Sequence, residues 1–313
     1  MKKTEKRVIV IGGPTATGKT ALGVALAQTI DGEIISADSM QIYRGMDIGT
    51  AKVTPQEAQG VPHHMVDVVS PNESFSVSAW VDMAAECAED IFARGRTPII
   101  VGGTGLYVDS LLSGRDFAES GINTEARREL GEEYDRIGGE AFREKLRALD
   151  PERAEKLHPS DKKRLVRALE VFTLTGKTMT QHDAETRALP PRWPSVRFAL
   201  SYADRDRLYE RIDRRVDAMV EQGLFAEVSN LLAEGLSPDS TAMQAIGYKE
   251  AARYLRGELS REEAIELIKL SSRRYAKRQL TWLRRDAGLH WIMRDSLPDT
   301  RDALAAVLET LSK

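Results

Sequence analysis

The fold of this chain is decided by the stretch Gly13-Pro14-Thr15-Ala16-Thr17-Gly18-Lys19-Thr20. It follows a compact apolar run, Val8–Ile11, and leads directly into Ala21–Ala27, which is rich in alanine and leucine. This order of strand, glycine loop and helix is the context in which the pattern G-x-x-x-x-G-K-[ST] binds phosphate. The glycines let backbone N–H groups turn inward around an anion, and the helix N-terminus adds partial positive charge. We therefore expect a compound with linked phosphates to bind at Gly13–Thr20.

Two side chains at the end of this loop have roles of their own. Lys19 is long enough to contact the outer phosphate oxygens, and the Thr20 hydroxyl suits a ligand of Mg²⁺. Mg²⁺ is therefore the expected cofactor, with Thr20 as its protein ligand.

Composition limits the class of protein. The 313 residues are 42% hydrophobic and 30% charged, which is typical of a globular domain, and no apolar run approaches the length of about 20 residues that spans a membrane. The single cysteine, Cys87, allows neither an intramolecular disulfide nor a cysteine-rich zinc site, and it fits a reducing cytoplasm. Because the net charge is −3, a nucleic-acid partner would need a local basic surface.

Strands alternate with helices through the first part of the chain. Glu33–Asp38 is expected to be a second buried strand that ends in a polar turn, and Ser76–Arg94 has the apolar periodicity of a helix. Thr97–Val101 is expected to be a further strand, followed by Gly102-Gly103-Thr104-Gly105. The pattern predicts an α/β fold with a parallel sheet like that of P-loop NTPases, and ligands bound at the carboxyl ends of the strands. The irregular segment Ser39–Val69 is long enough to be a functional loop.

The sequence changes character from about Asp116, where charged helices begin. This part closes at the stiff linker Leu189–Pro194, and Val196–Ser201 then reads as a strand that returns to the sheet. We therefore predict an all-helical insertion over 116–195 within an α/β core formed by 1–115 and 196–313. The C-terminal part is expected to be helical, with a last long helix from the capping-box pattern at Ser260 to about Asp286.

Asp38 is the acidic residue best placed to act beside the phosphate loop, since Thr97–Val101 leads only into glycines and Thr104. Spacing alone leaves two roles open. Asp38 could be a carboxylate on the metal side, which is the more common use in phosphate-loop proteins, or a general base that faces an acceptor nucleophile.

Distinctive stretches of sequence extend along nearly the whole chain, in the order Gly13–Thr20, Ser36–Tyr43, Asp47–Lys52, Val61–His64, Gly102–Tyr107, His158–Asp161, Arg164–Glu170, Ile246–Lys249 and Lys277–Arg284. Together they closely resemble the bacterial tRNA dimethylallyltransferases. The resemblance implies transfer of a dimethylallyl group from dimethylallyl diphosphate to N6 of the tRNA adenosine immediately 3′ of the anticodon, with release of pyrophosphate.

The resemblance also implies roles for individual residues. It makes Asp38 the general base, which reverses the preference from spacing alone, and it places Thr104 in the channel where the base and the allylic carbon meet. Gly13–Thr20 would bind the diphosphate. Arg215 would stabilise the departing pyrophosphate, and Arg214 is the alternative if the register shifts by one residue.

Two basic clusters suit an RNA partner, one around Lys162–Arg167 and one between Arg273 and Arg285. The target base must leave its stack to enter a channel. The resemblance implies tRNA contacts at Asp38, Ser39, Met40, Gln41, Thr104, Arg127, Lys163, Arg164, Leu165, Val166, Arg167, Gln244, Lys249, Lys277, Arg278, Gln279, Trp282 and Arg284.

Three other functions compete with this hypothesis. A small-molecule kinase would use the loop for ATP, but it gives no reason for the helical insertion. An enzyme that prenylates free AMP or ADP would use identical chemistry, yet a free nucleotide needs neither the insertion nor the basic clusters. A non-enzymatic nucleotide switch would not need Asp38 and Thr104 at one channel. We therefore expect a monomeric enzyme that binds the tRNA anticodon stem-loop and has no membrane association.

Overall fold

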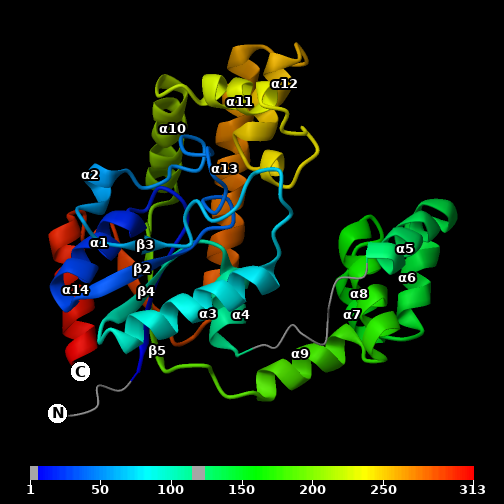
Figure 1. The fold of residues 1–313 in the computed structure, drawn as a ribbon, viewed down its shortest axis with the longest axis horizontal. Coiled ribbons are helices and arrows are strands. Elements are labelled where there is room, and N and C mark those ends of the chain that lie inside the picture. The colour runs from blue at the N-terminus through cyan, green and yellow to red at the C-terminus, as the bar shows by residue number, and fades with distance from the viewer. Residues whose placement is uncertain (1–5, 115–123) are drawn as a thin grey trace. The chain divides into compact units, whose positions relative to one another are not determined.

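A parallel β-sheet with helices on both faces forms the centre of the larger unit (Figure 1). The computed structural model describes residues 6–114 and 124–313. Within them the sheet has six strands in the order β3-β2-β4-β1-β5-β6, and every pairing is parallel. The predicted α/β class with a parallel sheet is confirmed. The strands are β1 (Val8–Gly12), β2 (Gly32–Ala37), β3 (His63–His64), β4 (Thr97–Gly102), β5 (Ser195–Ser201) and β6 (His290–Met293).

Both faces of the sheet are covered, as its sequence requires. Every residue of β1 and β2 is buried, since a parallel sheet leaves neither face to water. Helices α1 (Lys19–Ile30) and α14 (Thr300–Ser312) pack on the face that carries alternate strand residues such as Ile9 and Ile99. Helix α3 (Val77–Ala93) packs on β2 and β4, and its Trp80 is fully buried.

The chain divides into two compact units, and the smaller one is Leu112–Arg192. The sequence predicts an insertion over 116–195, but residues 193–195 belong to the larger unit, and Ser195 already begins β5. The predicted boundary at 115/116 lies outside the described residues. The described elements of the smaller unit are all helical and enclose a core of their own, which includes Phe142 and Leu169. They are α5 (Thr124–Ile137), α6 (Gly139–Arg147), α7 (Pro151–Lys156), α8 (Lys162–Thr175) and α9 (Met179–Ala188).

After this unit the chain returns to the sheet, as the sequence predicts. Residues Ser195–Ala199 of β5 pair with β1, and helix α13 (Arg261–Leu283) begins at the capping box of Ser260 and Glu263. Neither β6 nor α14 was predicted from the sequence. No described helix is both long and apolar enough to cross a membrane. The remaining helices are α2 (Pro55–Ala58), α4 (Gly105–Leu112), α10 (Arg205–Glu221), α11 (Leu224–Ala233), a 3-10 turn (Ala242–Gln244), α12 (Tyr248–Leu255) and α13 (Arg261–Leu283).

One buried carboxylate, that of Glu33 in β2, ties the sheet to the end of α3. Glu33 is 1% exposed and accepts hydrogen bonds from Arg94, at 2.9 Å to Oε2, and from Arg96, at 2.8 Å to Oε1. His64 Nε2 lies 2.7 Å from the same carboxylate. The hydrogen bonds from Arg94 are the main reason that the pKa of Glu33 is lowered to about 2.

Replacing Glu33 by Gln is therefore expected to cost about 2–3 kcal/mol of unfolding free energy at pH 7. The cost stays below that of a fully enclosed pair because Arg94 and Arg96 are 40% and 39% exposed and regain water. A carboxyl group whose pKa is lowered on folding stabilises the protein above its unfolded pKa, and this stability is lost as the pH falls towards 2. Urea unfolding at pH 7 and pH 3 measures the difference in unfolding free energy between wild type and Glu33→Gln. This difference should be smaller at pH 3.

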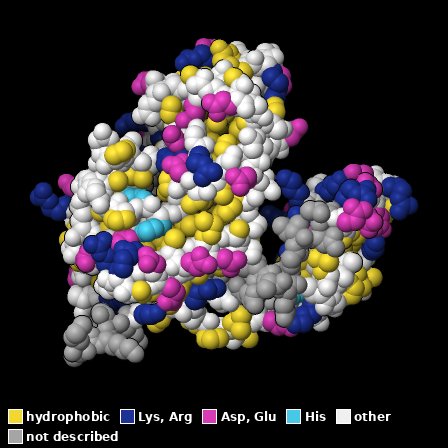
Figure 2. Space-filling model, in the orientation of Figure 1, with side chains coloured by type: hydrophobic (Ala, Val, Ile, Leu, Met, Phe, Trp, Pro, Cys, Tyr) yellow, Lys and Arg dark blue, Asp and Glu magenta, His cyan; other side chains and the backbone are white. Residues whose placement is uncertain are grey.

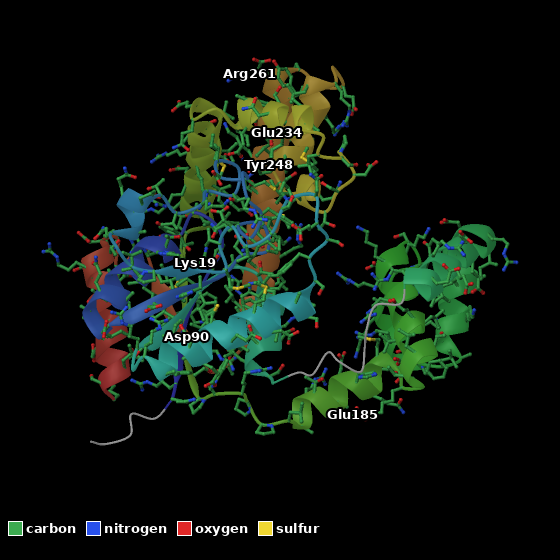
Figure 3. The ribbon with its side chains drawn as sticks, in the orientation of Figure 1. Lys19, Asp90, Glu185, Glu234, Tyr248 and Arg261 are labelled. Carbon is green, nitrogen blue, oxygen red and sulfur yellow. The ribbon has the colours of Figure 1, made fainter. Side chains whose placement is uncertain are left out.

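The matched control for this prediction is Asp90→Asn. Asp90 (Figure 3) pairs with the same Arg94 at 2.8 Å but is 64% exposed, so its loss should change stability little. Equal losses in the two variants would contradict the role assigned to the buried carboxylate.

Candidate active site

Three neighbouring strands deliver the chemistry-bearing residues to one edge of the sheet. β1 ends at the phosphate loop, β2 ends at Asp38, and β4, which lies between them, ends beside Thr104. A cavity of about 340 Å³ lies at this edge, within the larger unit. The residues around it that carry polar or charged side chains are Thr15, Lys19, Thr20, Asp38, Ser39, Gln41, Thr50, Arg215, Gln244, Lys249, Ser272, Tyr275, Arg278 and Gln279.

The backbone of the phosphate loop adopts a conformation that requires glycine at Gly13. Gly13 has φ +145°, and a Cβ atom there would lie 2.6 Å from the Leu200 carbonyl oxygen, so only glycine fits. Lys19 (Figure 3) directs its ammonium back over the loop and donates to the Pro14 carbonyl at 2.7 Å. Thr20 follows at the first turn of α1 and is exposed at the cavity. The loop therefore places a cation and a hydroxyl together where a phosphate would bind.

Two helices from the C-terminal part hold this loop in place. Arg211 of α10 donates from Nε to the Ala16 carbonyl at 3.0 Å. Gln279 of α13 accepts from the Thr15 N–H at 3.1 Å and donates to the Gly103 carbonyl at 3.0 Å. Arg211 was not predicted from the sequence as a site residue, although it lies four residues before Arg215 and so on the same face of α10.

Asp38 and Thr104 meet because β2 and β4 are paired to their ends. Ala37 is opposite Gly102, and the Thr104 hydroxyl accepts from the Ser39 N–H at 3.2 Å. Asp38 Oδ1 accepts from the N–H groups of Met40 and Gln41, at 2.9 and 3.4 Å. These contacts fix the Asp38 side chain, and within the described residues its second oxygen accepts no hydrogen bond.

Positive charge is concentrated at the phosphate end of the cavity. Burial is the largest cause that lowers the pKa of Lys19 to about 7, and the nearby Arg215 guanidinium adds to it. Burial also lowers the pKa of Arg215, whose Nε is enclosed with no hydrogen-bond partner among the described residues. Arg214, the alternative, has a 77% exposed side chain and pairs with Glu210. The structure therefore places Arg215, and not Arg214, at the cavity.

This arrangement predicts that binding of a diphosphate takes up a proton. A bound diphosphate favours the ammonium form of Lys19, so its pKa rises from about 7 towards its ordinary value of 10.5. Affinity should then fall as the pH rises above 7, by at most about tenfold per pH unit. Calorimetric titration at pH 8 in buffers of different ionisation enthalpy measures the uptake. In Lys19→Arg, which stays charged, the uptake should vanish, and uptake that persists there would refute the assignment.

Tyr275 of α13 is a cavity residue that the sequence analysis missed. Burial, and then the neighbouring Asp38 charge, raise the pKa of its hydroxyl to about 12. The Arg278 guanidinium lies over its ring, 5.5 Å from the centroid. The signal in the sequence is its spacing, four residues before Gln279 and seven after Ile268, which puts all three residues on one face of the helix.

The predicted tRNA contacts of the larger unit fall into two groups. Ser39, Met40, Gln41, Gln244, Lys249, Arg278 and Gln279 line the cavity, whereas Lys277 and Arg284 are exposed on or beside α13. Three polar side chains are already engaged within the protein. The amides of Gln41 and Gln279 bond to backbone and neighbouring groups, and Trp282 Nε1 donates to Asp109 at 2.6 Å. Direct contacts of these three side chains with RNA stay predictions.

One part of the tRNA prediction in the insertion needs correction. Leu165 and Val166 are 0% and 5% exposed, because they lie on the face of α8 that packs into the core of the insertion. Their side chains are therefore not available to RNA, and the prediction of side-chain contacts is wrong for both.

The basic residues of the insertion are accessible but partly paired. Arg127 and Arg167 both donate to the buried carboxylate of Glu170, at 2.8 and 2.9 Å. Arg164 is 74% exposed. On the face of this unit visible in Figure 2, basic and acidic side chains lie beside one another. RNA contacts by Arg127, Lys163, Arg164 and Arg167 stay predictions.

The donor set at the phosphate end fits Mg²⁺. The described residues contain no group of three or more His, Cys, Asp or Glu side chains that could hold a metal ion. Thr20 and Asp38 line the same cavity and offer oxygen atoms only. Mg²⁺ commonly takes one or two protein oxygens and completes its shell with phosphate oxygens and water.

The fold and the site define a class, that of phosphate-loop α/β proteins whose cavity joins a cationic phosphate end, after β1, to a carboxylate after β2, with β4 between the two strands. Within that class, the chain belongs to the IPP transferase family. The family model described as "IPP transferase" matches residues 41–286, and a second, described as "Isopentenyl transferase", matches residues 6–68.

Individual relatives agree with this membership. A protein of Thermoanaerobacter sp. strain X514, named tRNA dimethylallyltransferase, is 44% identical over 307 residues, which are 98% of each chain. The crystal structure of the full-length tRNA isopentenylpyrophosphate transferase of Bacillus halodurans matches with 42% identity and a TM-score of 0.74, covering 98% of this chain and 96% of that one. A eukaryotic dimethylallyltransferase acting on tRNA matches with 34% identity and a TM-score of 0.78, covering 89% of this chain and 70% of that one.

Proposed function

We propose that this protein is a tRNA dimethylallyltransferase. It transfers the dimethylallyl group of dimethylallyl diphosphate to N6 of the adenosine immediately 3′ of the anticodon and releases pyrophosphate. The observation that carries the proposal is the cavity itself, where the Asp38 carboxylate shares a space of about 340 Å³ with Lys19, Thr20 and Arg215. The names of the relatives, which specify tRNA and the dimethylallyl group, support the choice of substrates.

Asp38 acts as the general base. The exocyclic amine of adenine is a weak nucleophile because its lone pair is shared with the ring. As the bond from N6 to the allylic carbon forms, the amine proton passes to the Asp38 carboxylate, and the bond from that carbon to the diphosphate oxygen breaks. Proton removal by a positioned carboxylate contributes about 10²–10⁴-fold to the rate. The Thr104 hydroxyl, held 3.2 Å from the Ser39 N–H, borders the same point of attack.

The phosphate loop and Arg215 stabilise the group that leaves. Backbone N–H groups of Ala16–Thr20, the Lys19 ammonium and the Arg215 guanidinium surround the diphosphate, and their charges oppose the negative charge that grows as pyrophosphate departs. The Nε of Arg215, which has no hydrogen-bond partner among the described residues, would donate a hydrogen bond to this anion. When bound, Mg²⁺ neutralises part of the diphosphate charge, and Thr20 is the residue that would hold it, with Asp38 close by.

The acceptor reaches this cavity as a nucleotide turned out of its stack. Arg278 lines the cavity, and the exposed Lys277 and Arg284 extend the positive charge along α13. These residues give the larger unit its contact with the anticodon stem-loop, and Lys163 and Arg164 give the insertion its contact. The residues assigned to the reaction all belong to one chain, so the proposed chemistry needs no second copy, and the protein is proposed to act as a monomer. Its location is the cytoplasm, where tRNA occurs and where the single cysteine stays reduced.

A direct test incubates the protein with Mg²⁺, labelled dimethylallyl diphosphate and either undermodified tRNA or AMP. Label should enter tRNA, and nuclease digestion should recover it on the adenosine 3′ of the anticodon. Label that enters only AMP would show a free-nucleotide prenyltransferase instead. Transfer of phosphate from ATP to a small acceptor, with no prenyl transfer, would show a kinase.

A further inference from the structure

The side chain of Glu227 on α11 binds the backbone of a loop that borders the cavity. Its carboxylate accepts hydrogen bonds from three successive N–H groups, those of Asp47 at 2.9 Å, Ile48 at 2.8 Å and Gly49 at 3.2 Å. The hydroxyl of Tyr248, at the start of α12, donates to the same carboxylate. Four donors thus converge on one side chain that the reaction itself does not use.

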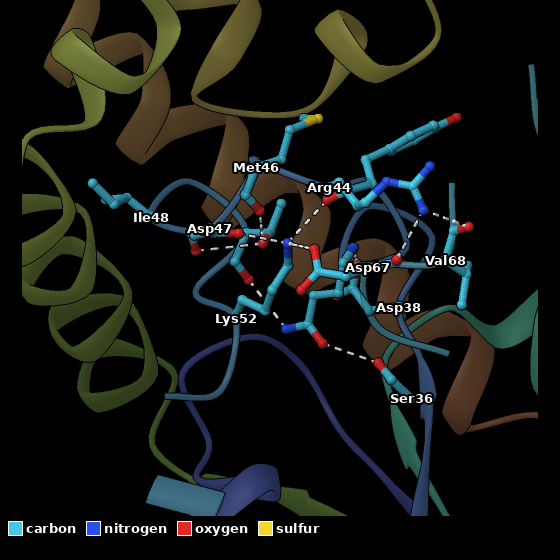
Figure 4. Close-up of polar contacts among 12 residues, drawn as sticks. Ser36, Asp38, Arg44, Met46, Asp47, Ile48, Lys52, Asp67 and Val68 are labelled. Atoms are coloured by element: carbon cyan, nitrogen blue, oxygen red, sulfur yellow. Dashed lines mark hydrogen bonds and ion pairs between the residues drawn. The ribbon is translucent and has the colours of Figure 1, made fainter. Parts of the chain in front are cut away.

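The loop that Glu227 holds is packed against the protein and fixed at its far end. Gly49 lies against the Tyr248 ring so closely that a Cβ atom would be 2.3 Å from the ring edge. The buried ammonium of Lys52 lies 2.6 Å from the carboxylates of both Asp47 and Asp67, as the dashed lines of Figure 4 show. The loop is therefore held by contacts at both of its ends.

This loop in turn holds the residue next to the proposed base. The carbonyl groups of Thr50 and Ala51 accept from Gln41 Nε2 at 3.2 and 3.3 Å. The Ser36 hydroxyl, labelled in Figure 4, donates to Gln41 Oε1 at 2.9 Å. The Gln41 N–H then donates to Asp38 Oδ1 at 3.4 Å. Hydrogen bonds and the backbone between them thus link Glu227, through the loop and Gln41, to Asp38.

We propose that Glu227 is a positioning residue of the active site: by binding the backbone of Asp47–Gly49 it fixes Gln41, and through Gln41 it fixes the orientation of the Asp38 carboxylate. The inference rests on the proposed role of Asp38 as the base. A base must lie within hydrogen-bond reach of the proton that it removes, and misplacement by about 1 Å costs roughly 10²-fold in rate. Gly49, Thr50 and Ala51 also line the cavity. The hydrogen bonds of Glu227 to this loop therefore also fix part of the wall of the space that the adenosine enters.

The first experiment compares Glu227→Gln with Glu234→Gln. Both residues belong to the α11 region and both changes remove one negative charge, but Glu234 (Figure 3) is exposed at the end of the helix. In Glu227→Gln an amide N–H₂ group replaces one acceptor oxygen and faces N–H donors. We expect kcat for tRNA prenylation to fall by about 10–100-fold, with KM for dimethylallyl diphosphate close to wild type because the phosphate loop is untouched. Glu234→Gln should match wild type in both.

Two further variants separate positioning from simple stabilisation. Tyr248→Phe keeps the ring that packs on Gly49 and removes only the hydroxyl, so we expect a smaller fall in kcat in a protein that folds normally. The double variant Asp38→Asn/Glu227→Gln completes a double-mutant cycle. If Glu227 acts through Asp38, replacing Glu227 in the Asp38→Asn background should lower kcat only slightly. All kcat values are measured well below each variant's unfolding midpoint.

The outcomes decide the inference. Unchanged kcat in folded Glu227→Gln, or a loss in kcat that is just as large in the Asp38→Asn background, would overturn it. The proposed function is tested separately by the wild-type protein in the same assay. If wild type prenylated AMP rather than tRNA, the same comparison of kcat would be made with AMP.

Discussion

Asp38→Asn is expected to lower kcat for prenyl transfer by about 10²–10⁴-fold, because the amide cannot accept the proton that leaves N6. The substitution keeps an oxygen that can accept from the N–H groups of Met40 and Gln41, so the turn after β2 should persist. Single-turnover assays at saturating dimethylallyl diphosphate and tRNA measure the chemical step.

Binding provides the control for this variant. The dissociation constant for tRNA should stay close to wild type, because the basic residues of α13 and of the insertion are unaltered. Turnover near the wild-type rate would assign the base to another residue. Normal chemistry with weakened tRNA binding would make Asp38 a recognition residue.

Replacing Arg215 by Met should lower kcat by about 10²–10³-fold, since one of the cationic groups that face the departing pyrophosphate is lost. The same variant should raise the pKa of Lys19, because the Arg215 charge now helps to lower it. Turnover is measured with saturating substrates. The pKa is followed by the pH dependence of dimethylallyl diphosphate binding.

The neighbouring arginine supplies the matched control. Arg214→Met removes the same charge from the same helix, but at a 77% exposed position whose partner is Glu210, and it should leave turnover and the pKa of Lys19 close to wild type. If the Arg214 variant lost activity and the Arg215 variant kept it, the assignment of the leaving-group arginine would be reversed.

Local physics explains what the sequence could predict about the fold. The phosphate loop, the strand before it and the helix after it are neighbours in sequence, and a left-handed glycine or a capping box depends on only a few adjacent residues. The short strand β6 gave no such signal, since two of its four residues, His290 and Trp291, are exposed. It exists because it pairs with β5 at the edge of the sheet.

The predicted site residues show the same difference between local and long-range information. Asp38 could be named from its place after a strand and Thr104 from the family resemblance, but Leu165 and Val166 are core residues because the packing of α8 decides which of its faces is buried. The choice between Arg215 and Arg214 was likewise open until the helical phase of α10 was fixed by its neighbours.

The sequence by itself determined the phosphate loop, the parallel α/β core and the nature of the groups that face a diphosphate. Only the tertiary structure decided which distant residues contact the site. Gln279 accepts a hydrogen bond from the Thr15 N–H, 264 residues away in sequence, and Glu227 accepts one from the Ile48 N–H, 179 residues away. The physical reason is range: caps, turns and glycine conformations depend on adjacent residues, whereas a contact between distant segments forms only when whole helices have packed against the sheet.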